Sequence, residues 1–213
     1  MLSLKEFDKK YTDCLISTYD QLIRVHDEIH KDYHFDLSTT EISEAILERL
    51  KAYYTTQRKI KYFLEKRYIA AASDFFVESI LFYLRLYLNA KGGQLQAHSE
   101  RQIAQKKNAI RPDISIWDNN KIVAIIECKT QLGWNRDNWE KQYNERNIKL
   151  TRLYPEAKSF LLVMTGLNWN GFGNHDKLND KYFCLLNDIW PDNYVSADQI
   201  FTPIEGLFKQ IAE

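Results

Sequence analysis

The segment that most constrains the fold is a pair of apolar stretches separated by a short polar turn. Residues 113–117 and 121–129 are rich in β-branched side chains, and Asn119-Asn120 lies between them. This pattern predicts a β-hairpin. Because the second stretch shows little alternation of apolar and polar residues, we expect it to be a central strand that is buried on both faces.

Charged groups lie at the open end of this hairpin. Asp113 begins the first strand, and Glu127 and Lys129 end the second. Side chains two positions apart on a strand point to the same face, so Glu127 and Lys129 should share one. Two carboxylates brought together can hold a divalent cation such as Mg²⁺, to which the backbone carbonyl of Cys128 could add a third protein oxygen. The Cys128 side chain should point to the opposite face, into the core.

The length of the turn decides whether the two carboxylates meet. A strict two-residue loop pairs Asp118 with Lys121 and, counting outward, Asp113 with Ile126. That register would place Asp113 and Glu127 on opposite faces of the sheet. A shared site therefore requires either a loop with an odd number of residues or a bulge in one strand.

The arrangement of these residues resembles the PD-(D/E)xK nuclease superfamily, which includes many restriction endonucleases. The motif is Pro112-Asp113 followed by Glu127-Cys128-Lys129. The resemblance implies a Mg²⁺-dependent endonuclease acting on DNA, with Mn²⁺ as a possible substitute. Asp113 and Glu127 would be the metal ligands, and Lys129 would orient or help to deprotonate the attacking water and stabilise the developing charge.

The same resemblance adds a residue on each of two helices. Glu78 lies in an otherwise apolar helical segment without a basic helical neighbour, at the place where many members of the family complete the metal site with a glutamate. Gln142 lies on the helix after Lys129, where several branches carry a glutamine or a basic residue facing the site. The spaced Gln-x3-Tyr pattern of one branch is absent, since Tyr143 is adjacent to the glutamine and position 146 is Arg.

The resemblance covers about residues 73–190 and implies an α/β (α+β) fold with a restriction-endonuclease-like core. In such a core, helices flank a mixed central sheet. We expect residues 71–213 to form this core and residues 1–70 to form a helical region that packs on it. Hydrophobic periodicity places helices at about 3–30, 57–68, 73–88, 138–153 and 203–211, and strands at 95–98, 113–117, 121–129, 159–165 and 182–186. A capping-box pattern of Ser38 with Glu41 opens a further helix, which carries the apolar residues from Ile42 to Leu50.

The binding surface is expected next to the carboxylates. Arg101, Lys106, Lys107 and Arg111 form a basic run that leads into Asp113, and we expect it to contact DNA, which would be double-stranded. A solvated basic face is the alternative. The zero formal net charge argues against an indiscriminate polyelectrolyte binder, but not against segregated charge.

A different reading of the motif stays open: a non-catalytic nucleic-acid-binding or assembly module on the same fold, or a subunit of a defence or repair complex. Cleavage of both strands by one site per chain suggests a homodimer. The three widely spaced cysteines favour a reducing, cytoplasmic location, and no apolar run reaches the ~18 residues of a membrane span. His26 and His30 are spaced to share a metal or to be simply exposed.

Overall fold

The computed structural model describes residues 3–104, 109–132, 139–167 and 175–213. Contacts divide the chain into two units, Met1–Phe35 and Asp36–Glu213. The first unit contains the single helix α1 (Leu4–Asp32), which has no buried residue. Ser3 and Glu6 form a capping box at its N-terminus, which satisfies backbone N–H groups that have no partner within the helix.

The second unit is built on one mixed sheet. Its five strands follow one another in chain order, with antiparallel pairs β1–β2 and β2–β3 and parallel pairs β3–β4 and β4–β5. The strands are β1 (Leu95–Ser99), β2 (Ile114–Asp118), β3 (Lys121–Lys129), β4 (Lys158–Thr165) and β5 (Tyr182–Leu186). The helices are α2 (Glu41–Phe63), α3 (Ser73–Ala90), α4 (Trp139–Leu153) and α5 (Ile204–Ala212), with short 3-10 turns η2 (Pro191–Asn193) and η3 (Ala197–Gln199).

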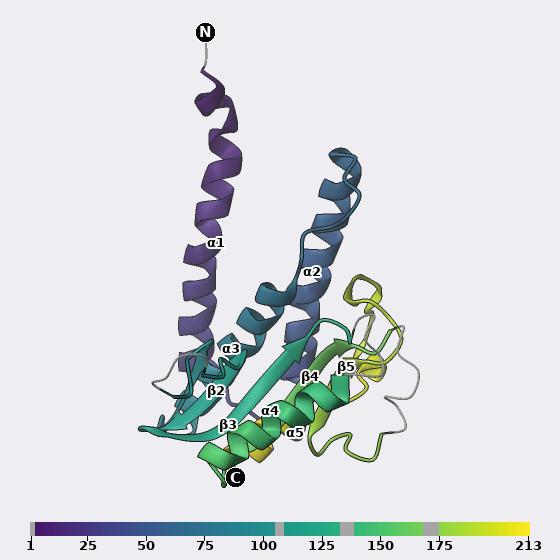
Figure 1. Ribbon diagram of the computed structural model, residues 1–213. Helices are drawn as coiled ribbons and strands as arrows, with labels where there is room; N and C mark the ends of the chain where they lie inside the picture. Colours follow the sequence, from purple (N-terminus) through teal and green to yellow (C-terminus); the bar gives the residue numbers. More distant parts are fainter. Residues whose placement is uncertain (1–2, 105–108, 133–138, 168–174) are drawn as a thin grey trace. The chain divides into compact units, whose positions relative to one another are not determined.

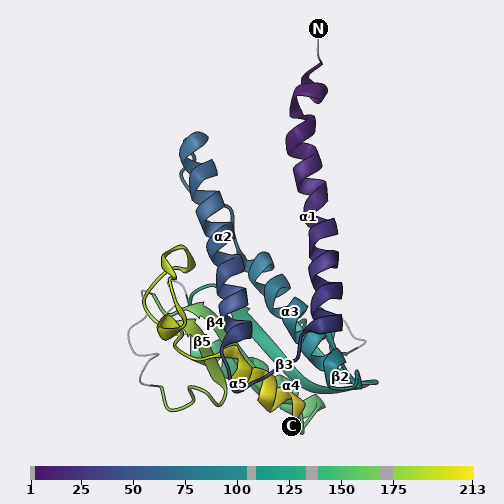
Figure 2. The same ribbon diagram turned by 180° about the vertical axis from the view of Figure 1, so that it is seen from behind.

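Helices cover both faces of the sheet (Figures 1 and 2). On one face, α3 and α5 lie together, and the rings of Tyr87 and Phe208 stack with their centroids 5.7 Å apart. On the other face, Leu150 of α4 packs in a cluster with Ile125 of β3. Because both layers are apolar, β4 and β5 and the middle of β3 are almost wholly buried, as expected for a sheet covered on its two sides, whereas the edge strand β1 is mostly not buried.

The expected fold class is therefore confirmed: a mixed α/β sheet flanked by helices, with a helical N-terminal region. The strand at 121–129 is the middle strand, and Ile122, Ile125 and Ile126 have no exposed surface. A sheet of this kind agrees with the restriction-endonuclease-like core that the sequence led us to expect.

A buried carboxylate ties α2 to α5. Glu205 is 2% exposed and accepts hydrogen bonds from the backbone N–H of Ser43 (2.9 Å) and from the Ser43 hydroxyl (2.5 Å). The same hydroxyl accepts from the Ile204 N–H at 2.8 Å. Since the first turn of a helix has free N–H groups and a partial positive charge, this carboxylate stabilises the start of α2.

Some local predictions differ from the structure. Ser38 does not cap α2 in a box with Glu41, because its N–H and hydroxyl donate to Asp36 and the N-cap is Thr40. Residues 57–63 continue α2 and are not a separate helix. The division between the units falls after Phe35, so α2 belongs with the sheet, whereas the sequence placed the start of the core near residue 71.

Other features of the chain bear on its class. No helix in the described ranges is long and apolar enough to cross a membrane. Cys14 is exposed, Cys128 and Cys184 are buried, and all three are free thiols. His26 and His30 stack with ring centroids 6.1 Å apart, but among the described residues no group of three His, Cys, Asp or Glu side chains is placed to hold a metal ion.

Candidate active site at the end of the central strand

A bulge sets the register of the hairpin. Asp118 pairs with Lys121 across a two-residue turn, and the register then shifts between Ile116 and Trp117. Because of this shift, Ile114 pairs with Ile126. The register continued by one residue sets Asp113 opposite Glu127. Of the two solutions that the sequence allowed, the chain uses the bulge and not the odd loop.

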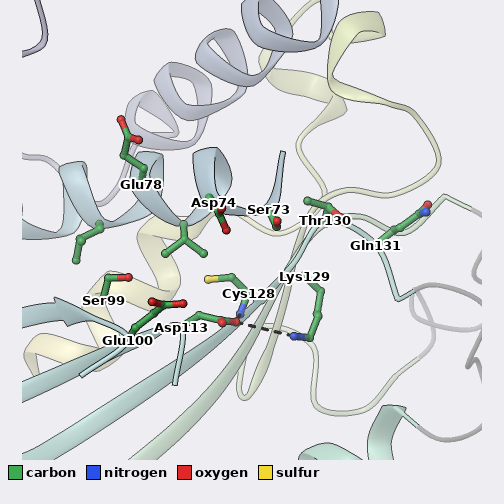
Figure 3. A pocket seen from close by; sticks show the side chains of 12 residues that line it. Ser73, Asp74, Glu78, Ser99, Glu100, Asp113, Cys128, Lys129, Thr130 and Gln131 are labelled. Atoms are coloured by element: carbon green, nitrogen blue, oxygen red, sulfur yellow. Dashed lines mark hydrogen bonds and ion pairs between the residues drawn. The ribbon is translucent and has the colours of Figure 1, made fainter. Parts of the chain in front are cut away.

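Asp113 directly precedes β2, and its carboxylate accepts a hydrogen bond in the place of a backbone carbonyl. Its Oδ2 accepts a hydrogen bond of 2.7 Å from the N–H of Cys128. Asp113 lines a pocket of about 620 Å³ between the first turns of α3 and the ends of β1 and β3 (Figure 3). Its side chain is 30% exposed, so the residue stays accessible from the pocket.

Lys129 forms a long ion pair with Asp113. Its Nζ lies 3.9 Å from Asp113 Oδ2, and the side chain is 49% exposed. Lys129 lines the Asp113 pocket and also a second pocket, of about 200 Å³, on the α4 side of β3. Lys129 is therefore the residue that the two pockets share.

Glu127 lies in this second pocket and is 3% exposed. Arg146 of α4 donates a hydrogen bond to its Oε2, while Oε1 is buried and has no hydrogen-bond partner among the described residues. Burial raises the pKa of the Glu127 carboxyl, Arg146 and Lys129 oppose that shift, and the Asp113 charge adds to it. Asp113 and Glu127 thus interact electrostatically but line different pockets.

The backbone of Cys128 faces Asp113. Within a strand the N–H and C=O of one residue point to the same neighbouring strand, so the Cys128 carbonyl is directed to the side from which Asp113 accepts its N–H. Its thiol is buried, and burial raises its pKa well above the usual value. Cys128 also lines the Asp113 pocket (Figure 3), so its expected place on the face opposite the site stays a prediction.

The α3 residue Glu78 lines the Asp113 pocket, but its side chain is exposed and its carboxylate points away from Asp113 in Figure 3. Its role in the site stays a prediction. Glu100, by contrast, was missed by the sequence analysis. It follows β1 in a left-handed conformation (φ 50°), donates its N–H to the Asp113 carbonyl and lines the same pocket. Only the β1–β2 register could have placed it there.

On α4, Gln142 and Arg146 both line the Glu127 pocket, and both side chains are exposed to solvent on their outer sides. Arg146 is the one that contacts a predicted site residue. Spacing on the helix explains their common orientation, because positions four apart lie on one face.

The predicted DNA-contacting residues are only partly described. Arg101 lies with its guanidinium carbon 3.9 Å from the ring centroid of Trp117, and Arg111 is exposed. Lys106 and Lys107 lie outside the described residues.

Two features bear on whether these residues suit a divalent metal. Mg²⁺ commonly takes one or two protein carboxylates and fills its other positions with water and phosphate oxygens. Glu127 Oε1 is a buried acceptor to which no described residue donates a hydrogen bond, and an oxygen-seeking cation would satisfy it. The donor set of Asp113, Glu127 and the Cys128 carbonyl is composed of oxygens only, so the residues fit such an ion.

Comparison with known proteins leaves the family open. No protein-family model matches the chain, and no curated protein matches it. Among solved structures, the chain is similar to "native BbvCI A2B2 tetramer at low resolution", with 13% identity over 91% of this chain and 96% of that chain and a TM-score of 0.34. A likeness this distant carries no argument about function, which must come from the residues themselves.

The buried carboxyl of Glu127 leads us to expect that the stability of the protein depends on pH. A carboxyl whose pKa is raised in the folded protein binds more protons there than in the unfolded chain, so stability falls as pH rises from its ordinary pKa through the raised one. We expect Glu127→Gln to remove this loss. Its melting temperature at neutral pH should exceed that of the wild type by about 2–4 °C, the shift that about 1 kcal/mol produces in a chain of this size. Below the ordinary glutamate pKa the two proteins should melt together. A wild type that melts at the same temperature as the variant at every pH would contradict the assignment.

Proposed function

We propose that the protein is a Mg²⁺-dependent endonuclease that hydrolyses phosphodiester bonds in double-stranded DNA, of the restriction-endonuclease type. The observation that carries the proposal is Glu127. A 3% exposed carboxylate, one of whose oxygens has no hydrogen-bond partner among the described residues, is costly to keep. It lies at the end of the central strand and interacts electrostatically with Asp113 and Lys129. Charged groups held in this way cluster at functional sites more often than in ordinary cores.

The proposed ligands of Mg²⁺ are Asp113, Glu127 and the Cys128 carbonyl. When bound, the ion would lower the pKa of a water molecule and neutralise charge on the phosphate. The N–H of Cys128 fixes Asp113 Oδ2 at 2.7 Å, so one carboxylate is oriented before any ligand arrives. Orientation in advance matters because the reacting groups then need no reorganisation during the reaction.

Lys129 would act on water and phosphate. Its Nζ, 3.9 Å from Asp113 Oδ2 and half exposed, can donate hydrogen bonds to a phosphate oxygen that enters the Asp113 pocket. In the same position it can orient a water molecule or accept its proton when deprotonated. Since an ammonium group is not a metal ligand, its contribution should be separable from metal binding.

Arg146 would position Glu127. Its guanidinium donates to Oε2 and leaves Oε1 for another partner. An arginine that is 45% exposed can also move toward solvent or toward a phosphate, since its side chain is only partly enclosed. Because Arg146 forms an ion pair with Glu127, we assign it the role of a counter-ion that keeps the Glu127 carboxylate charged and in place.

The DNA would approach across the Asp113 pocket. Arg111 is exposed two residues before Asp113, and Lys106 and Lys107 remain proposed phosphate contacts. Cleavage of both strands would suit a homodimer or a larger complex.

A non-catalytic nucleic-acid-binding or assembly module is the second candidate. The observation in its favour is that Asp113 and Glu127 line separate pockets, with Glu127 engaged by Arg146. In a scaffold, Arg146 would be the counter-ion of Glu127 and no metal would be needed.

A plasmid-cleavage assay separates the two. Supercoiled plasmid is incubated with the protein and Mg²⁺, with Mn²⁺, and with Mg²⁺ plus excess chelator. The endonuclease converts it to nicked and linear forms in the first two reactions and not in the third. Binding of the plasmid without conversion in any metal would favour the module.

A further inference from the structure

The second half of α2 projects beyond the core of its unit. Tyr54 is the last buried residue of the helix, and the helix continues to Phe63. Nine further residues correspond to about 14 Å of helix. We call residues 58–68, which form the end of this projection and the turn that follows it, the α2 tip (Figures 1 and 2).

The turn of the α2 tip has a defined geometry. The Lys66 N–H donates to the Lys61 carbonyl at 3.0 Å and the Glu65 N–H to the Tyr62 carbonyl at 3.3 Å, with Glu65 at φ 51°. This is the Schellman ending of a helix, in which the left-handed position is usually Gly. The backbone of the tip thus forms a defined turn, although a non-glycine residue at this φ is unfavourable.

Cations are concentrated on the α2 tip. It contains Arg58, Lys59, Lys61, Lys66 and Arg67 against the single acid Glu65. Arg58 pairs with Asp192 of η2. Within the part of the chain that the structure describes, the three lysines form no ion pair, so their charges are available to a partner.

Large apolar side chains alternate with these cations. Tyr62 is 75% exposed, Phe63 85%, Leu64 57% and Tyr68 67%. The Arg67 guanidinium carbon lies 5.0 Å from the centre of the Tyr68 ring. Cations beside exposed rings suit nucleic acid, because the cations neutralise phosphates and the rings stack on or wedge between bases.

The α2 tip is joined directly to the rim of the Asp113 pocket. The segment that returns from the tip is held against α2 by the Tyr53 hydroxyl, which donates to the Ala71 carbonyl at 2.8 Å, and by the stacked rings of Tyr53 and Phe75. Immediately after Ala72, Ser73 and Asp74 line the pocket. A ligand that spans the pocket opening and follows the return segment would therefore meet the tip.

We propose that the α2 tip is a DNA-binding finger that grips the duplex beside the candidate active site. Lys59, Lys61 and Lys66 contact phosphates, and the rings of Tyr62 and Phe63 contact bases or sugars in the groove. The inference rests on the proposed function, since it takes DNA to be the substrate. It adds a second contact surface, separate in sequence from the basic run at 101–111.

The test is DNA binding without catalysis. Binding of a short fluorescein-labelled duplex is followed by anisotropy in chelator at a series of KCl concentrations. We compare Lys59→Ala/Lys61→Ala/Lys66→Ala with a control that removes the same number of exposed charges elsewhere, Lys121→Ala/Lys181→Ala/Lys209→Ala. The tip variant should bind at least about tenfold more weakly, and its log–log salt slope should be shallower by about 2–3, since each lost phosphate contact contributes about 0.9.

Removal of the Tyr62 and Phe63 rings should affect DNA binding differently from removal of the lysines. Tyr62→Ala/Phe63→Ala should weaken binding by about tenfold and leave the salt slope unchanged, because the rings contact bases or sugars and carry no charge. Equal affinity and slope for the lysine tip variant, its control and the wild type would overturn the proposal. So would binding of anionic vesicles but not of duplex by the tip. Plasmid conversion by the wild type in Mg²⁺ is measured separately. The proposal for the α2 tip can therefore be contradicted while nuclease activity is observed, and nuclease activity can be absent while the tip binds DNA.

Discussion

Asp113→Asn and Glu127→Gln should each abolish plasmid cleavage in Mg²⁺. Each substitution replaces a charged oxygen ligand with a neutral amide of nearly the same size, which weakens binding of a hard cation. We expect a loss of about a thousandfold or more in single-turnover rate, which corresponds to roughly 4 kcal/mol of lost transition-state stabilisation.

A matched control is available in the same hairpin. Asp118→Asn changes an exposed carboxylate at the far end of β2 from Asp113, where it should leave cleavage unchanged. Circular dichroism and melting temperature establish that each variant is folded. Wild-type cleavage by either Asp113→Asn or Glu127→Gln would remove that residue from the metal site.

Lys129→Met should separate chemistry from binding. The substitution keeps much of the length of the side chain and removes the ammonium group that lies 3.9 Å from Asp113 Oδ2. We expect the single-turnover rate to fall by about 10²- to 10⁴-fold, the usual range for loss of a proton-transfer or charge-stabilising group. Mn²⁺ binding, measured by calorimetry, and duplex binding, measured by anisotropy, should both persist.

Lys121→Met provides the control, because it removes an exposed lysine at the other end of the same strand. It should cleave like wild type. If Lys129→Met also cleaves like wild type under single-turnover conditions, the assigned role is wrong and the non-catalytic module becomes the better account.

Glu127 shows how the proposed activity and stability oppose each other. Its burial raises the pKa of the carboxyl, so the ionised form is held at a cost to the fold. The same substitution, Glu127→Gln, is therefore expected to raise the melting temperature and to abolish cleavage. Functional sites are commonly maintained at the expense of stability in this way.

The sequence by itself determined the strands and the kind of residue at their ends. The apolar stretch at 121–129 predicted a buried central strand because a segment covered on both sides needs no polar alternation, and β3 is the middle strand. The hairpin arithmetic also showed that a two-residue turn needs a bulge if Asp113 is to face Glu127, and the bulge is present.

Tertiary structure decided the partners of those residues. Arg146 reaches Glu127 because α4 packs on the face of β3 that carries Glu127, a contact that no local pattern specifies. Glu100 meets Asp113 only through the pairing of β1 with β2. Likewise, only the fold showed that α2 continues beyond Tyr54, its last buried residue, and that the chain then returns to the pocket rim at Ser73. Local periodicity reports which face of an element is apolar, whereas the meeting of distant elements depends on packing of the whole chain.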